Sequence, residues 1–196
     1  MDIVLNICIG IALAATCGFR IFVPLLALSV AGLAGVVDLG SSFQWIGTYQ
    51  AVIVFGVATL VEILAYFIPY VDNILDAASV PFSVMAGVVV TAAVMTDVSP
   101  ILRWAMAIIA GGGAAAAGSL VSNGVHAAST LASGGAANPV VSTVESTGSI
   151  VASILAVAVP ILAVVLIVTA IFLIYRFFIR AKRRGRIAME NGEAGP

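Results

Sequence analysis

Long apolar stretches are the feature that most constrains how this chain can fold. Five stretches of its 196 residues are nearly free of charge, running from about residue 3 to 37, 49 to 69, 80 to 96, 101 to 131 and 148 to 178. A bilayer core requires about twenty apolar residues in helical form, because unpaired backbone groups are costly in hydrocarbon. The pattern therefore predicts an all-α integral membrane protein with about five transmembrane helices.

The composition points to the same class. Hydrophobic residues make up 62% of the chain and charged residues only 9%, whereas a soluble domain carries about a quarter charged residues. Most basic residues lie in one C-terminal run, at positions 176, 180, 182, 183, 184 and 186. Such a run stays on the cytoplasmic side of a membrane. We therefore expect a transmembrane domain over residues 1–179, a flexible cytoplasmic tail over 180–196, and no nucleic-acid partner.

The first and fourth stretches are too long for one perpendicular crossing, since a helix rises about 1.5 Å per residue and the hydrocarbon is about 30 Å thick. Each contains a weak point, at residues 17–20 in the first and at 111–113 in the fourth. If the first stretch is a tight hairpin turning near Arg20, the crossings number six and the N-terminus moves to the cytoplasmic side. The Ser99-Pro100 pair is expected to begin the helix of the fourth stretch.

Two pairs of segments are similar in the same order along the chain. Residues 14–18 align with 114–118, and residues 63–69 align with 154–160. Three predicted crossings separate the partners, so the two units would have opposite orientations in the membrane, as in many transporters. The alignment predicts a two-helix inverted repeat.

Two charged residues, Arg20 and Glu62, lie well inside apolar stretches. Each costs about 2.5–3.5 kcal/mol at the centre of a membrane helix, and the two are accommodated most cheaply by each other or by a shared hydrated cavity. One interpretation makes them a gate or a substrate-binding pair. The other has Arg20 reaching the membrane surface and Glu62 neutral in a helix contact.

Further acidic residues allow two interpretations each. If the connection before the third stretch is helical, Asp72 and Asp76 share one face and could bind a cation or a basic partner. Otherwise this segment is an interfacial loop in which Asp76 or Ser79 caps the next helix. Glu145 stands three residues after Ser142, the spacing of a capping box, or it belongs to a polar site.

His126 is the only histidine, and it shares a helical face with Gly118 and Ser122. It is either a hydrogen-bonded packing residue or a ligand. The cysteines, this histidine and the scattered carboxylates lack the spacing of a metal site, and no nucleophile motif occurs. We therefore expect no metal, no cofactor and no enzyme activity.

Small residues are concentrated between positions 110 and 133. Gly111 with Ala115, and Gly118 with Ser122, have the four-residue spacing that lets helix backbones approach closely in lipid. These pairs fit the core of the fold itself, a homodimer, or a partner membrane protein.

Several of these residues carry a resemblance to a known family. They are Gly18-Phe19-Arg20 with Pro24-Leu25-Leu26, Glu62 with Ile68-Pro69, Asp72, Asp76, Pro81 with Gly87, Gly118, His126, and Pro139-Val140-Val141-Ser142 with Glu145. From about residue 10 to 178 the chain resembles an uncharacterised bacterial membrane family, domain of unknown function 4126. More polar or basic residues are expected in that family around Ser122 and Asn123. The resemblance implies a multi-pass protein of the bacterial plasma membrane and brings no activity with it.

Our leading hypothesis is a small transporter or channel-like protein, because substrate and ion pathways use costly intramembrane charges and broken helices. The competing hypothesis is a non-catalytic scaffold or accessory subunit that packs through the Gly/Ala-rich helix. The residues expected to line a polar path are Arg20, Glu62, Asp72, Asp76, His126 and Glu145.

Overall fold

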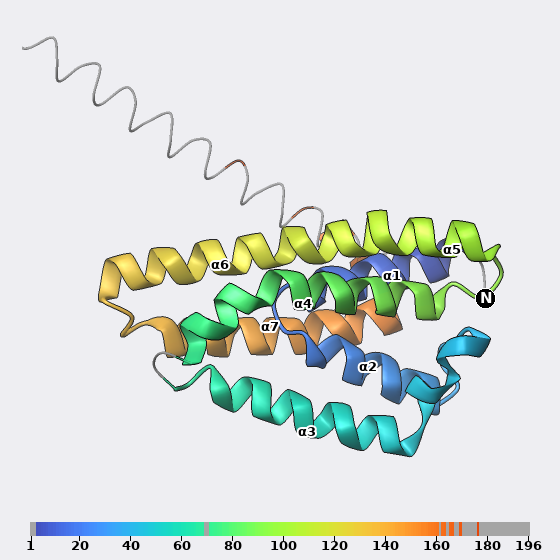
Figure 1. Cartoon of the computed structure of the whole chain (residues 1–196), viewed down its shortest axis with the longest axis horizontal. Helices are drawn as coiled ribbons and strands as arrows, with labels where there is room; N and C mark the ends of the chain where they lie inside the picture. The colour runs from blue at the N-terminus through green and yellow to red at the C-terminus, as the bar shows by residue number, and fades with distance from the viewer. Residues whose placement is uncertain are drawn as a thin grey trace, which may run out of the picture.

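The chain forms a bundle of helices in the computed structural model (Figure 1). In chain order these are α1 (Ile3–Cys17), α2 (Phe22–Leu33), the 3-10 helix η1 (Ser41–Gly47), α3 (Tyr49–Ala65), α4 (Val71–Val94), α5 (Pro100–Met106), the π-helical η2 (Ala107–Gly112), α6 (Gly113–Ser133) and α7 (Asn138–Ala158). The structure describes residues 3–68, 71–160, 162–163, 165–166, 169 and 176, without the side chains of 72, 73 and 77. These residues contain no strand, so the predicted all-α class is confirmed.

Helices α6 and α7 bury polar side chains and expose apolar ones, the reverse of a helix on the surface of a soluble protein. The buried face of α7 carries a row of serines at the helical period: Ser142, Ser146, Ser149 and Ser153. Its exposed face carries Val140, Val144, Val151 and Ile154. Helix α6 follows the same rule, burying Ser119, Ser122 and His126 while exposing Leu120 and Leu131. An exterior of this kind is compatible with a membrane protein, whose surface faces hydrocarbon.

Within the part of the chain that the structure describes, two helices are long and apolar enough to cross a membrane, namely the continuous helix Pro100–Ser133 and α7. A third is added if η1 and α3, which are bent by 64° relative to each other, count as one span. Helices α1 and α2 and the Ala78–Val94 part of α4 are apolar but shorter. The expected five or six crossings therefore stay a prediction.

The first apolar stretch breaks where its sequence is weakest. Helix α1 ends at Cys17, α2 begins at Phe22, and the two run in opposite directions as a hairpin (Figure 1). The turn lies inside the bundle, because Gly18 packs against Ala115 and Ser119 near the middle of the Pro100–Ser133 helix. The predicted tight hairpin near Arg20 is thus present. Its arms of 15 and 12 residues are shorter than a full span.

The fourth apolar stretch does not break at its glycines, although a weak point was expected at residues 111–113. The helix instead continues through the π-helical segment η2. Glycine serves close packing here, since a Cβ on Gly111 would lie 2.7 Å from the carbonyl oxygen of Gly87 in α4. The predicted start of this helix is confirmed, because the Ser99 side chain accepts a hydrogen bond from the Leu102 amide and Pro100 follows it.

Two other helices begin before the apolar stretches that predicted them. Helix α4 begins at Val71, so the helical interpretation of residues 72–79 is confirmed and the loop interpretation is wrong. Helix α7 begins at Asn138, with Pro139 in its first turn, where proline is well tolerated. The segment from Ser142 to Glu145 is therefore inside a helix, and its capping-box interpretation is wrong. The predicted tail, residues 180–196, lies outside the described residues.

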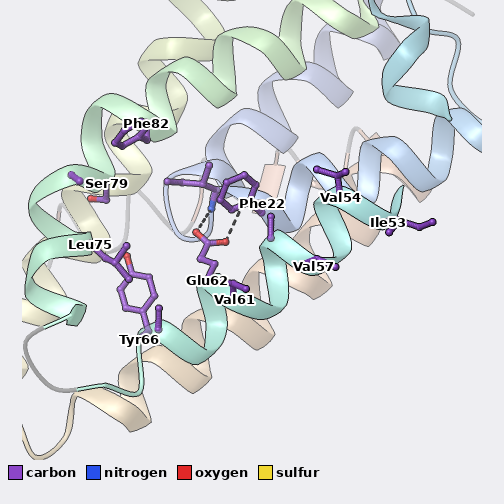
Figure 2. Close-up of a pocket in the computed structure, with 14 residues that line it drawn as sticks. Phe22, Ile53, Val54, Val57, Val61, Glu62, Tyr66, Leu75, Ser79 and Phe82 are labelled. Atoms are coloured by element: carbon purple, nitrogen blue, oxygen red, sulfur yellow. Dashed lines mark hydrogen bonds between the residues drawn. The ribbon is translucent and has the colours of Figure 1, made fainter. Parts of the chain in front are cut away.

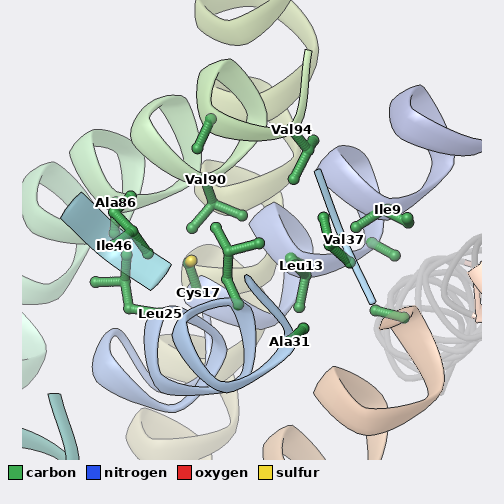
Figure 3. Close-up of a cluster of buried hydrophobic side chains, with 14 of the residues drawn as sticks. Ile9, Leu13, Cys17, Leu25, Ala31, Val37, Ile46, Ala86, Val90 and Val94 are labelled. Atoms are coloured by element: carbon green, nitrogen blue, oxygen red, sulfur yellow. The ribbon is translucent and has the colours of Figure 1, made fainter. Parts of the chain in front are cut away.

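The apolar core joins α1, α2 and α4 (Figure 3), with Ile9, Leu13, Leu28, Val90 and Val94 fully buried.

Helices α1 and α6 meet at two glycines. A Cβ on Gly118 would lie 2.5 Å from the carbonyl oxygen of Ala15 and 3.1 Å from the Cα of Gly18. These are the glycines that end the aligned segments 14–18 and 114–118, so the two segments touch in space. The inverted repeat itself stays a prediction.

We expect Gly118→Ala to destabilise the fold by about 1–3 kcal/mol, because the added methyl group collides with backbone atoms that cannot move aside independently. Gly113→Ala is the matched control on the same helix. A Cβ there meets nothing within 4 Å, and the better helix propensity of alanine adds about 0.5–1 kcal/mol. Thermal unfolding of the detergent-solubilised variants measures the difference, and equal midpoints would contradict the close contact.

Candidate functional site

Arg20 is held in the interior by neutral partners. Its side chain is 1% exposed. Its Nε donates a hydrogen bond to Ser146 Oγ at 2.9 Å, and its Nη2 donates to the Ser142 carbonyl oxygen at 3.0 Å. The guanidinium carbon lies 3.8 Å from the centroid of the Tyr66 ring, a cation–π contact. Arg20 therefore does not reach the surface of the bundle.

Glu62, on α3, stabilises the beginning of α2. Its Oε1 accepts a hydrogen bond from the Ile21 amide at 2.7 Å and its Oε2 accepts one from the Phe22 amide at 3.1 Å (Figure 2). Ile21 has no capping side chain of its own, and the positive end of the helix dipole favours a carboxylate at this place. Glu62 thus connects α3 to the hairpin turn.

The two charges buried in the bundle therefore have separate partners. Both side chains are described, and they do not form an ion pair with each other. Arg20 is bound by α7 and Tyr66, while Glu62, 8% exposed, is bound by backbone amides. The direct pairing considered from the sequence is absent from this part of the structure.

His126 lies between two carboxylates. Its Nε2 is 3.0 Å from Glu145 Oε2, and its Nδ1 is 3.3 Å from Asp76 Oδ2. We call these three residues the acid–imidazole triad; they come from α4, α6 and α7. The other carboxylate oxygen of Glu145 accepts a hydrogen bond from Ser122 Oγ at 2.8 Å. The triad therefore joins three helices through side chains that are 2% exposed in His126, 8% in Glu145 and 17% in Asp76.

Neighbouring polar groups hold the Asp76 turn of α4 against α6. Asn123 Nδ2 donates a hydrogen bond to the Asp76 carbonyl oxygen at 3.2 Å. Ser79 Oγ lies 2.8 Å from the same oxygen and 3.2 Å from Asn123 Oδ1. The backbone on which Asp76 is mounted is thus positioned independently of its carboxylate.

Tyr66 links the two groups of charges. The Arg20 guanidinium packs on its ring, and the ring contacts the His126 ring edge to face, with 5.9 Å between centroids. Sequence reasoning did not single out Tyr66 or the serines that bind Arg20. The period of the serines along α7 could have revealed its polar interior face, whereas nothing in the sequence places Tyr66 next to His126.

A cleft of about 810 Å³ opens between α3 and α4, and Tyr66 forms part of its wall (Figure 2). Its walls are mainly apolar and include Val57, Leu75 and Phe82. Glu62, Tyr66 and Ser79 are its polar lining residues. Tyr66 therefore contacts both the cleft and the histidine of the triad.

The structure brings four of the predicted path residues, Arg20, Asp76, His126 and Glu145, into one network, with Glu62 at its border. The side chain of Asp72 lies outside the described residues. Of the three predicted packing residues, Gly111 and Gly118 lie in helix contacts, whereas Ser122 belongs to the polar network. Among the described residues, no group of three or more His, Cys, Asp or Glu side chains is arranged to hold a metal ion.

Comparison with known proteins finds one family. The sequence model described as Domain of unknown function (DUF4126) matches residues 7–180, nearly the whole chain, in agreement with the resemblance seen in its motifs. No curated protein and no solved structure matches the chain.

We expect Glu62→Gln to lower the free energy of unfolding by about 1.5–3 kcal/mol, the contribution of a hydrogen bond to a charged group. An amide offers one acceptor oxygen, so either the Ile21 or the Phe22 amide would face an NH₂ group. Asp38→Asn removes an exposed carboxylate and serves as control. Faster hydrogen exchange at residues 21 and 22 in Glu62→Gln alone is the expected result. Unchanged protection would show that Glu62 does not stabilise the start of α2.

Proposed function

This chain belongs to the family described as Domain of unknown function (DUF4126), a description that names no activity, so we propose a function from its buried network. The protein is a multi-pass transporter of small cations in the bacterial plasma membrane, with its C-terminus in the cytoplasm. The network of Arg20, Tyr66 and the acid–imidazole triad is its ion or substrate site.

The observation that carries this proposal is the gathering of ionisable side chains from separate helices inside an apolar bundle. Each such group is costly in a membrane interior, and membrane proteins keep them mainly where an ion or a substrate passes. The hairpin turn inside the bundle supports the same function, because transporters commonly build their sites at interrupted helices.

The balance of charge favours a cation over an anion. Glu62, Asp76 and Glu145 bring three carboxylates to this region, and Arg20 is the one residue with a permanent positive charge among the network members. With a neutral His126 the group carries an excess of negative charge, which a bound cation neutralises. An anion would meet repulsion from the carboxylates.

The cleft between α3 and α4 lies next to this site. Glu62 and Ser79 are in its wall, and the Tyr66 ring contacts both the cleft and His126. Displacement of this ring is the step that we expect to connect the cleft with Asp76 and Glu145.

The scaffold alternative lacks a comparable observation. The small residues expected to bind a partner, Gly111 and Gly118, are buried against α4 and α1 of the same chain. Close packing at these positions is used by the fold itself.

Cation flux into proteoliposomes tests the proposed function, with radioactive Na⁺, Rb⁺ and methylammonium as probes under a K⁺-diffusion potential. We expect flux above that of protein-free liposomes and a loss of about tenfold or more in Asp76→Asn and Glu145→Gln, equivalent to at least ~1.4 kcal/mol in the barrier. Asp38→Asn is the matched control, since its carboxylate is exposed and outside the network.

Two results would count against the proposal. If the wild-type protein carries none of the three probes faster than empty liposomes, cation transport is rejected. If Asp76→Asn and Glu145→Gln both carry flux equal to that of Asp38→Asn, the triad is not part of the path.

A further inference from the structure

We propose that the acid–imidazole triad is a proton-binding site, in which His126 carries a second ring proton held between Asp76 and Glu145. In the proposed transport function, on which this role in coupling rests, the bound proton is the coupling ion. Proton binding itself requires only the geometry of the triad.

The donor and acceptor count at His126 leads to this conclusion. A neutral imidazole has one N–H group and one nitrogen lone pair, whereas an ionised carboxylate has only acceptors. Nε2 is hydrogen-bonded to Glu145 Oε2 at 3.0 Å, and Nδ1 lies 3.3 Å from Asp76 Oδ2, at ion-pair distance but outside hydrogen-bond geometry. In the neutral ring, one nitrogen lone pair would point at a carboxylate oxygen without a proton between them. With both carboxylates ionised, only the doubly protonated ring has an N–H group on the side of each partner.

The surroundings of the ring favour the added charge. Asp76 on α4 and Glu145 on α7 contact it directly, and Glu62, on α3, lines the cleft together with Tyr66, which packs against the ring. Arg20, in the α1–α2 turn, opposes it but is already bound by α7 and by the Tyr66 ring. A protonated His126 brings the charge of the triad from −2 to −1 in a site that is largely shielded from water.

Release of the proton would change how the helices hold together. The proton enters from water, forms the second N–H bond on the ring lone pair, and returns to water when that bond breaks. After its release, one carboxylate loses its donor and faces the ring lone pair. The contact of α6 with either α4 or α7 is then weakened beside Tyr66, which lines the cleft. Proton release would therefore loosen the helix contacts beside Tyr66, a residue that lines the cleft.

The chain contains a single histidine, which makes the test direct. In protein labelled with ¹⁵N-histidine, freed of any affinity tag and reconstituted in lipid bilayers, the solid-state NMR signals report the two ring nitrogens of His126 alone. We expect two protonated nitrogens near pH 7 in the wild type and in Asp38→Asn. In the double variant Asp76→Asn and Glu145→Gln, we expect one protonated and one unprotonated nitrogen.

A neutral His126 in the wild type near pH 7 would overturn the proton site, as would an equally protonated ring in the double variant. These outcomes are separate from the fate of the transport function. A protonated ring in a protein that carries no cation leaves the proton site standing and rejects transport. Cation flux with a neutral ring leaves transport standing and rejects the proton site.

Discussion

The two hydrogen bonds from the Ile21 and Phe22 amides to Glu62 are the interaction on which the rest of the structure depends. A chain that reverses direction inside an apolar bundle exposes backbone amides where no water can satisfy them, and each unpaired group is costly. One carboxylate from α3 satisfies two of them and also complements the dipole of α2. The hairpin can therefore end in the interior, where Gly18 fits against α6 and Arg20 reaches α7.

The interior contains two kinds of polar group with different physical properties. Arg20 is bound by a hydroxyl, a carbonyl and an aromatic ring, so its charge is stabilised by neutral groups that do not titrate with it. The triad consists of ionisable groups alone, and its charge depends on the number of protons it holds. The first arrangement suits a fixed structural charge, and the second suits a charge that changes. Tyr66 touches both and lines the cleft, which makes it the mechanical connection between them.

Local features were predictable from the sequence, and the grouping of residues was not. The all-α class, the break after Cys17 and the Ser99 cap follow from hydropathy and helix punctuation, which act over a few residues. The start of α7 was placed too late and that of α4 was left open between a helix and a loop, because polar side chains in their first two turns, such as Asp76 and Ser142, lower the local hydropathy. Arg20, Asp76, His126 and Glu145 stood out singly as ionisable residues in or beside apolar stretches. Their assembly depends on how α4, α6 and α7 pack, which no local pattern encodes.

Glu62 and Glu145 illustrate how the same side chain differs in role according to its partners. Both oxygens of Glu62 are engaged by backbone amides of a helix start, and these donors cannot turn away without unwinding α2. The oxygens of Glu145 are engaged by a serine hydroxyl and an imidazole, which can rotate or exchange a proton while the helices stay intact. Loss of the Glu62 carboxylate would therefore weaken the fold, whereas proton exchange at His126 leaves the backbone paired. A loss of flux on substitution of Glu62 would consequently not place that residue on the cation path, and Glu145 is the acid whose substitution separates function from folding.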